Sequence, residues 1–233
     1  PIDVDNVVKE LMREIEGVYK AKLDKLYPVL AIDTNVLYIR LLTNWILNRF
    51  EKSFEAPPIV MSDVVSKEIT RYIESPRYID PQKLKTLRKF CKSNELYSDL
   101  LFNNLESIEV RKAKLAFHER ICLEHALKPR FLTISGYTRE RYDLGVVEGY
   151  SEFKKRHHQW NLLLLTCDDN IRFLAHSKNI ATLFVNQSNV EMVKILPYEM
   201  FPKLMLSLAT YLLQVNIRSK FFNVEVRGVW RGK

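Results

Sequence analysis

Short apolar runs alternate along this chain with longer stretches of helical periodicity, and this alternation limits the possible folds more than any other feature. Strand-like runs occur at residues 29–32, 59–61, 162–166 and 182–185, with a short strand or extended loop at 131–134. Helical spacing of apolar residues occurs at 4–23, 36–50, 64–73, 170–177 and 197–213. Short, fully apolar runs are typical of parallel strands buried on both faces. The pattern predicts an α/β protein, a three-layer α/β/α sandwich around a mostly parallel sheet.

The length of 233 residues and the hydrophobic content of 47% suit one domain, and no linker-like segment interrupts the chain. We therefore expect a single domain over residues 1–233, with its core at about 29–185. A helical insertion is expected at about 75–128. A C-terminal helix and a strand at 221–230 are expected to form an extension over about 197–233.

Cysteine usage and hydropathy bear on the compartment. Three cysteines without regular spacing argue against a disulfide framework. The first residues do not resemble a signal peptide, and no apolar run is long enough to span a bilayer. We expect a cytoplasmic protein without a membrane partner. The sequence leaves open whether the chain forms a homo-oligomer or joins a larger complex.

The net charge of +8 favours a polyanionic partner, of which nucleic acid is the commonest. One basic cluster flanks the helix expected around Asp143, and we expect it to bind RNA: Arg139, Arg141, Lys154, Lys155 and Arg156. Other cations lie in the insertion and beside aromatic residues in the C-terminal tail, a combination that suits single-stranded RNA. Each cluster taken singly is better explained as a solvated surface, but together, near an acidic crevice, the clusters favour a nucleic-acid substrate.

Two acidic residues follow strand-like runs. Asp33 ends the first run, and Asp168 comes shortly after the run at 162–166. Because ligands bind beyond the carboxyl ends of strands in open parallel sheets, both are candidate site residues. Glu68 and Asp143 lie on expected helices that can face the same crevice. Four carboxylates in one crevice repel one another unless a hard cation such as Mg²⁺ or Mn²⁺ neutralises them.

Four segments that contain these acids resemble, in the same order along the chain, the motifs of PIN-domain nucleases, a family with toxin-type and RNA-processing endoribonucleases. They are AIDTNVL at 31–37, SDVVSKEI at 62–69, DLGVV at 143–147 and LLTCDD at 164–169. The first and last are the more specific. The segment between Glu68 and Asp143 is long for a small member of that family.

The resemblance implies a metal-dependent endoribonuclease that hydrolyses phosphodiester bonds of single-stranded RNA with Mg²⁺ or Mn²⁺. Its catalytic and metal-binding residues would be Asp33, Glu68, Asp143 and Asp168. Asp169 would be a further metal ligand or a helix cap. Supporting roles fall to Asn35, which would hold Asp33, and to Thr166, which would orient the Asp168 loop. Glu148 and Glu152, on the helix of Asp143, are alternatives for the third acid.

Three alternatives remain at the level of sequence. The chain can be a non-catalytic RNA-binding or scaffold module with the same fold, or a structure-specific DNA nuclease. His118, Cys122 and His125 share a helix face at the spacing i, i+4 and i+7. A zinc site would need a fourth ligand or a water, and no partner cluster is evident, so ordinary packing is favoured there.

Overall fold

The computed structural model describes residues 4–20, 27–43, 47, 56–78, 80, 82, 106–136, 142–185, 201–212, 214–218 and 225–230. The chain divides into two compact units. The first combines residues 1–71 with 115–191, and the second combines residues 72–114 with 192–233.

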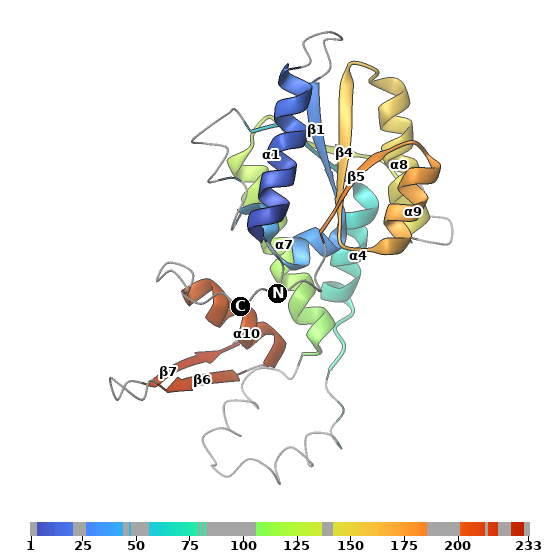
Figure 1. Ribbon diagram of the computed structural model, residues 1–233. Helices are drawn as coiled ribbons and strands as arrows, with labels where there is room; N and C mark the ends of the chain where they lie inside the picture. The colour runs from blue at the N-terminus through green and yellow to red at the C-terminus, as the bar shows by residue number, and fades with distance from the viewer. Residues whose placement is uncertain are drawn as a thin grey trace. The chain divides into compact units, whose positions relative to one another are not determined.

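A five-stranded, entirely parallel sheet forms the centre of the first unit, in the order β3-β2-β1-β4-β5 (Figure 1). The strands are β1 (Tyr27–Ile32), β2 (Ile59–Ser62), β3 (Phe131–Ile134), β4 (Trp160–Thr166) and β5 (Ala181–Phe184). Residues 29–32 of the central strand are at most 1% exposed, as expected for a strand covered on both faces. The sheet confirms the predicted α/β class.

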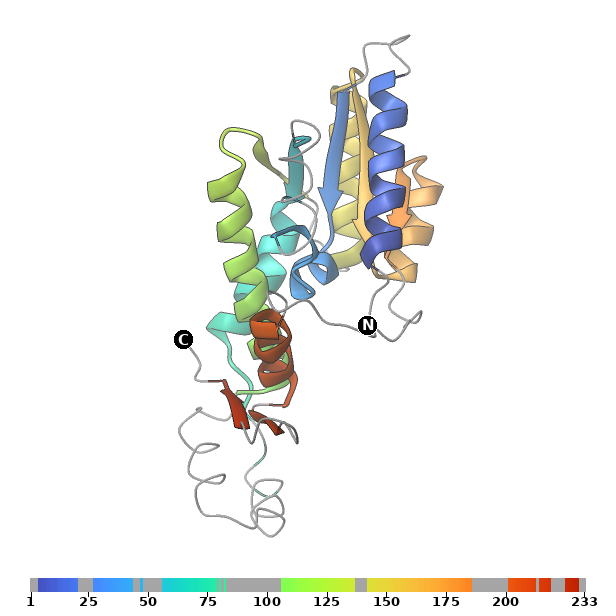
Figure 2. The ribbon, with the colours of Figure 1, turned by 60° about the vertical axis from the view of Figure 1, so that its left-hand side comes forward.

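Helices cover both faces of this sheet. They are α1 (Val4–Lys20), α2 (Thr34–Tyr38), α4 (Asp63–Glu74), α7 (Ile108–Ala126), α8 (Tyr142–Arg156) and α9 (Asp169–Ser177). The chain steps from β1 to β3 in one direction and from β4 to β5 in the other. Right-handed crossovers therefore put α8 and α9 on the face opposite α4. In Figure 2, α1 and α8 lie on opposite sides of β1 and β4, which confirms the predicted three layers.

The strand order creates a switch point at the carboxyl ends of β1 and β4. These strands pair side by side, with Ile32 opposite Leu165, but the connections that follow them leave in opposite directions. A crevice forms where neighbouring connections diverge in this way, and ligands of open α/β sheets bind there. The residues after Ile32 and Leu165 thus lie at the edge of the sheet best suited to a site.

The helix predicted at 36–50 is the main difference from the sequence interpretation. The helix α2 ends at Tyr38, and Arg40 adopts a left-handed backbone conformation with φ of 53°. The fully buried Glu119 of α7 holds this turn, because its carboxylate accepts hydrogen bonds from the Thr43 amide at 2.9 Å and from the Arg40 Nε at 3.4 Å. Helical backbone resumes at 41–43, while residues 44–46 and 48–50 lie outside the described residues.

In the second unit, α10 (Phe201–Leu212) packs on an antiparallel hairpin of β6 (Gln214–Arg218) and β7 (Glu225–Val229). A C-terminal helix and the strand β7 match the expected extension, whereas β6 was not predicted. Of the expected insertion at 75–128, residues 83–105 lie outside the described residues. No helix in the described part of the chain is both long and apolar enough to cross a membrane.

Candidate acidic site

Asp33 occupies the first position after β1 and begins α2 as its N-cap. Its side chain is 2% exposed, and both oxygens accept hydrogen bonds. Oδ1 accepts from the Thr34 amide at 2.6 Å. Oδ2 accepts from the Thr166 hydroxyl at 3.1 Å and from the Asn35 side-chain amide at 3.3 Å. Because Thr166 ends β4, the carboxylate bridges the two strands at the switch point.

Burial raises the pKa of the Asp33 carboxyl to about 7, since the apolar surroundings disfavour the ionised form. The hydrogen bonds from Thr166, Thr34 and Asn35 lower this pKa in part, and the charge of Glu68 raises it further. The site therefore holds a carboxylate whose negative charge is poorly compensated by its surroundings.

Glu68 reaches the same edge of the sheet from α4. Its Oε2 accepts a hydrogen bond from the Thr34 hydroxyl at 2.6 Å, so a residue that the sequence marks only as a turn or cap residue joins two of the acids. Burial raises the pKa of Glu68, and so do the charges of Asp143 and Asp168, while Arg71 opposes the increase.

Asp143 and Asp168 complete the group from the other face of the sheet. Asp143 lies in the first turn of α8, and its pKa is raised by burial and by the charge of Asp168. Asp168 caps α9, accepting from the Asn170 amide at 2.8 Å, and its own amide donates to the Thr166 hydroxyl at 3.0 Å. The four acids from four elements thus form one electrostatically coupled cluster, which we call the acidic cluster.

The other candidate acids lie elsewhere. Asp169 is in the first turn of α9 and forms an ion pair with Arg172 at 2.8 Å, with its side chain 60% exposed. Glu152 pairs with Arg156 at 3.3 Å near the other end of α8. Glu148 follows Asp143 by five residues, which is a rotation of about 140° around a helix. This geometry favours Asp143 over Glu148 and Glu152 as the third acid and places Asp169 outside the cluster.

Tyr150 holds the elements that carry the cluster and was not singled out by sequence reasoning. Its hydroxyl donates to the Ile32 carbonyl at 2.5 Å and accepts from the Ser62 amide at 3.1 Å. The side chain is fully buried, and burial raises its pKa. One residue of α8 thereby ties together the carboxyl ends of β1 and β2. The only sequence feature that could have pointed to Tyr150 was its position two turns from Asp143 on the same helix face.

The predicted RNA-binding cations separate into two groups. Arg139 and Arg141 lie outside the described residues. Lys154, Lys155 and Arg156 form the last turn of α8. At a rise of about 1.5 Å per residue, they lie roughly 16–20 Å along the helix from Asp143. These cations do not surround the acidic cluster. An RNA strand that contacted both the cations and the cluster would have to run along α8.

Arginine–aromatic pairs occur on the elements that carry the acidic cluster. The guanidinium of Arg71, on α4, lies 5.8 Å from the centre of the Tyr142 ring. Tyr142 is the residue that precedes Asp143. Arg172, on α9, lies 4.5 Å from the Phe184 ring and 5.2 Å from the Phe173 ring. Such pairs offer both a cation and an aromatic face to a ligand.

The donor atoms of the acidic cluster limit the kind of metal ion that it could hold. Within the described residues, no three His, Cys, Asp or Glu side chains are placed so that together they could bind a metal ion directly. No ion pair in this part of the chain neutralises any of the four acids. Mg²⁺ retains several waters and needs only one or two direct carboxylate ligands. The oxygen donors and their uncompensated charge therefore fit a hydrated hard cation, not a closed protein shell.

The candidate zinc residues show no such arrangement. The Cys122 thiol lies 3.5 Å from the His118 Nδ1, one turn apart on α7, but neither forms a metal-binding group with the described residues.

Comparison with protein-family models finds none that matches this chain, and comparison with curated proteins finds no significant match. The fold and the chemistry of the acidic cluster are therefore what indicates a function for this chain.

Proposed function

We propose that this protein is a metal-dependent endoribonuclease of the PIN type that hydrolyses phosphodiester bonds of single-stranded RNA. The observation that carries the proposal is the convergence of Asp33, Glu68, Asp143 and Asp168. Burial and the charges of neighbouring acids raise the pKa values of Asp33, Glu68 and Asp143 at the carboxyl edge of the sheet. Like charges are brought together at a cost in stability, and a hard cation offsets that cost.

Three of the four acids are held in place by contacts of their own. Asp33, buried and fixed by three hydrogen bonds, is the most rigidly placed anionic group. Glu68 is oriented by the Thr34 hydroxyl, and Asp168 by its backbone bond to Thr166. When bound, Mg²⁺ or Mn²⁺ supplies activation of water and neutralisation of charge at the phosphate. The residues of the chain hold and orient the carboxylate oxygens that would bind this cation.

The choice of RNA as substrate is supported by charge and by aromatic groups. The chain carries a net charge of +8, although its cluster is acidic. Tyr142 and Phe173 are 38% and 64% exposed, and each lies beside an arginine near the cluster. Exposed rings with neighbouring cations suit stacking of unpaired bases and contact with phosphates.

Cleavage of labelled single-stranded RNA in Mg²⁺, Mn²⁺ or EDTA tests the proposal. We expect metal-dependent cutting that falls by about a hundredfold or more in Asp33→Asn and Asp168→Asn. Loss of a charged metal ligand should reduce activity more than loss of a residue that only supports a ligand. Asp169→Asn is the matched comparison, since this neighbouring acid is paired with Arg172 at the surface. It should retain activity within a few-fold of wild type.

Four other outcomes would contradict parts of this assignment. Equal loss in Asp168→Asn and Asp169→Asn would mean that both acids serve the cluster. Cutting that persists in Asp33→Asn would remove the cluster from the reaction. RNA binding without cutting in any metal would indicate a binding module, and cutting of branched DNA alone would indicate a DNA nuclease.

A further inference from the structure

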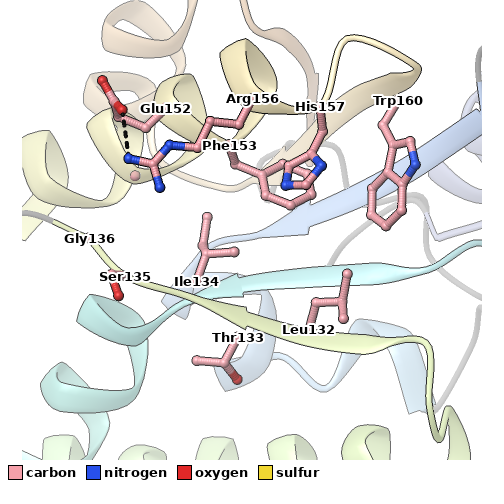
Figure 3. Close-up of a pocket in the computed structure, with 11 residues that line it drawn as sticks. Leu132, Thr133, Ile134, Ser135, Gly136, Glu152, Phe153, Arg156, His157 and Trp160 are labelled. Atoms are coloured by element: carbon pink, nitrogen blue, oxygen red, sulfur yellow. Dashed lines mark hydrogen bonds and ion pairs between the residues drawn. The ribbon is translucent and has the colours of Figure 1, made fainter.

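A separate pocket of about 570 Å³ lies between β3 and the C-terminal half of α8, and none of the four acids lines it (Figure 3). One wall consists of residues 132–136, from β3 and the turn that follows. The other consists of residues from the last turns of α8 and the start of β4. Its volume lies within the range of pockets that take small organic ligands.

Three aromatic rings line one side of the pocket. The ring centre of Phe153 lies 4.5 Å from that of His157 and 5.5 Å from that of Trp160, and the last two are 5.7 Å apart. Figure 3 shows the rings as a row opposite Leu132 and Ile134. Phe153 is buried, whereas His157 and Trp160 are half-buried and keep part of their faces accessible. Such a wall favours a flat aromatic ligand.

The opposite wall offers backbone groups. No described strand pairs with the outer edge of β3. The Arg130 carbonyl accepts from the Ile59 amide of β2, and peptide groups alternate in direction along a strand. The N–H and C=O of Thr133 therefore face the open edge. The Thr133 side chain points away from the pocket in Figure 3, so this residue lines it with its backbone. This N–H donor and this C=O acceptor could form hydrogen bonds with the acceptor and donor groups on the edge of a nucleobase.

Arg156 supplies a cation at one end of the pocket. Its guanidinium pairs with Glu152 at 3.3 Å, but the two side chains are 72% and 38% exposed. An exposed pair of this kind is weak, and arginine exchanges it readily for a phosphate, which accepts two hydrogen bonds at once. Lys155 lies 3.9 Å from the same Glu152 carboxylate, yet it does not line the pocket.

We propose that this pocket binds one nucleotide, with its base against His157 and Trp160 and its phosphate at Arg156. An unpaired nucleotide of an RNA strand and a free nucleotide share this chemistry. The use of the pocket during cleavage rests on the proposed function, but binding itself requires no reaction. The two proposals can therefore fail separately.

The test measures binding of the four nucleoside monophosphates by calorimetry, in EDTA and with full-length Asp33→Asn protein. Arg156→Gln should weaken binding by about tenfold or more, since it removes a charge-assisted hydrogen bond. Lys155→Gln removes the same charge one residue away and should change the affinity less than about twofold. Trp160→Leu should weaken binding by about tenfold through lost stacking, and Trp160→Phe should restore most of it.

A second arm distinguishes the two sources of the nucleotide. A labelled single-stranded RNA is bound to the same variants in EDTA. A larger loss of RNA affinity for Arg156→Gln than for Lys155→Gln would mean that the pocket binds a nucleotide of the RNA strand. A loss confined to monophosphates would assign it to a free nucleotide. The proposal is overturned if no monophosphate binds at millimolar concentration, or if Arg156→Gln and Lys155→Gln behave alike. In either case, RNA cleavage by the wild type that is lost in Asp33→Asn would still support the proposed nuclease function.

Discussion

At the scale of single residues, Asp33 shows how the candidate site acts against stability. Its carboxyl is buried beside Glu68, and both the burial and the neighbouring charge favour the protonated form. Three hydrogen bonds keep the side chain in place but do not supply a positive charge. A buried, poorly compensated acid is unusual in a purely structural role and common where a cation or a proton is handled.

The raised pKa of Asp33 leads to a prediction about stability in EDTA. Its folded-state pKa of about 7 exceeds the ordinary value of 3.8, so the folded protein binds the proton more tightly than the unfolded chain. This contribution is present below pH 4 and is lost as the pH rises through 7. Over that window the unfolding free energy should fall by an amount of the order of 4 kcal/mol from this residue alone. Chemical denaturation at a series of pH values measures it.

Asp33→Asn provides the control, because an amide does not titrate in this range. The unfolding free energy of this variant should depend less on pH than that of wild type, by an amount that corresponds to about one proton. The raised pKa values of Glu68 and Asp143 act in the same direction and should leave a residual slope. Identical slopes in the two proteins would show that Asp33 ionises normally.

At the scale of elements, the site depends on close contact between α8 and the carboxyl ends of β2 and β3. A Cβ added to Gly136 would lie 2.5 Å from the Ser62 hydroxyl and 2.5 Å from a methyl group of Val64. A Cβ on Gly149 would lie 3.1 Å from the Gly136 Cα. The two glycines thus allow α8 to pack against the turn after β3, which positions both Asp143 and Tyr150.

We predict opposite effects for two glycine substitutions. Gly136→Ala should destabilise the protein by about 1–3 kcal/mol, because its side chain would overlap its neighbours and the packing must shift. Gly17→Ala should be stabilising by about 0.5–1 kcal/mol. Gly17 is an exposed position in α1, and nothing lies within 4 Å of an added Cβ. Thermal or chemical unfolding of both variants measures the difference. Equal effects would mean that the turn at Gly136 accommodates a side chain.

At the scale of the whole molecule, the overall charge and the acidic cluster have opposite signs. A net charge of +8 attracts an RNA strand from a distance, whereas the four carboxylates repel its phosphates at close range. In the proposed function, binding by the basic surface and reaction at the cluster would therefore be separate requirements, and the second would need a cation.

This separation predicts a strong salt dependence of RNA binding in the absence of metal. For Asp33→Asn in EDTA, neutralisation of three or more phosphates would weaken binding by about tenfold or more between roughly 50 and 200 mM salt. A fluorescence anisotropy titration at several salt concentrations measures the slope. A flat profile would indicate that the positive charge does not contact the strand.

Much of the fold follows from the sequence. Apolar runs bounded by polar residues mark the strands, since a strand covered on both faces leaves no position for a charge. Asp33 comes directly after such a run and Asp168 two residues after another, so their place at the carboxyl edge of the sheet follows from the strand assignment. The predicted class, the parallel sheet and most helix bounds therefore depend on local pattern alone.

The tertiary structure decided which of the candidate residues come together. The strand order β3-β2-β1-β4-β5 brings Thr166 to Asp33, although 133 residues separate them in the chain. Asp168 and Asp169 are adjacent in sequence, but their side chains have different partners: Asp168 belongs to the cluster and caps α9, whereas Asp169 pairs with Arg172. The turn at Arg40 likewise depends on Glu119 of a distant helix. Local patterns do not encode such contacts, because each depends on the packing of elements far apart along the chain.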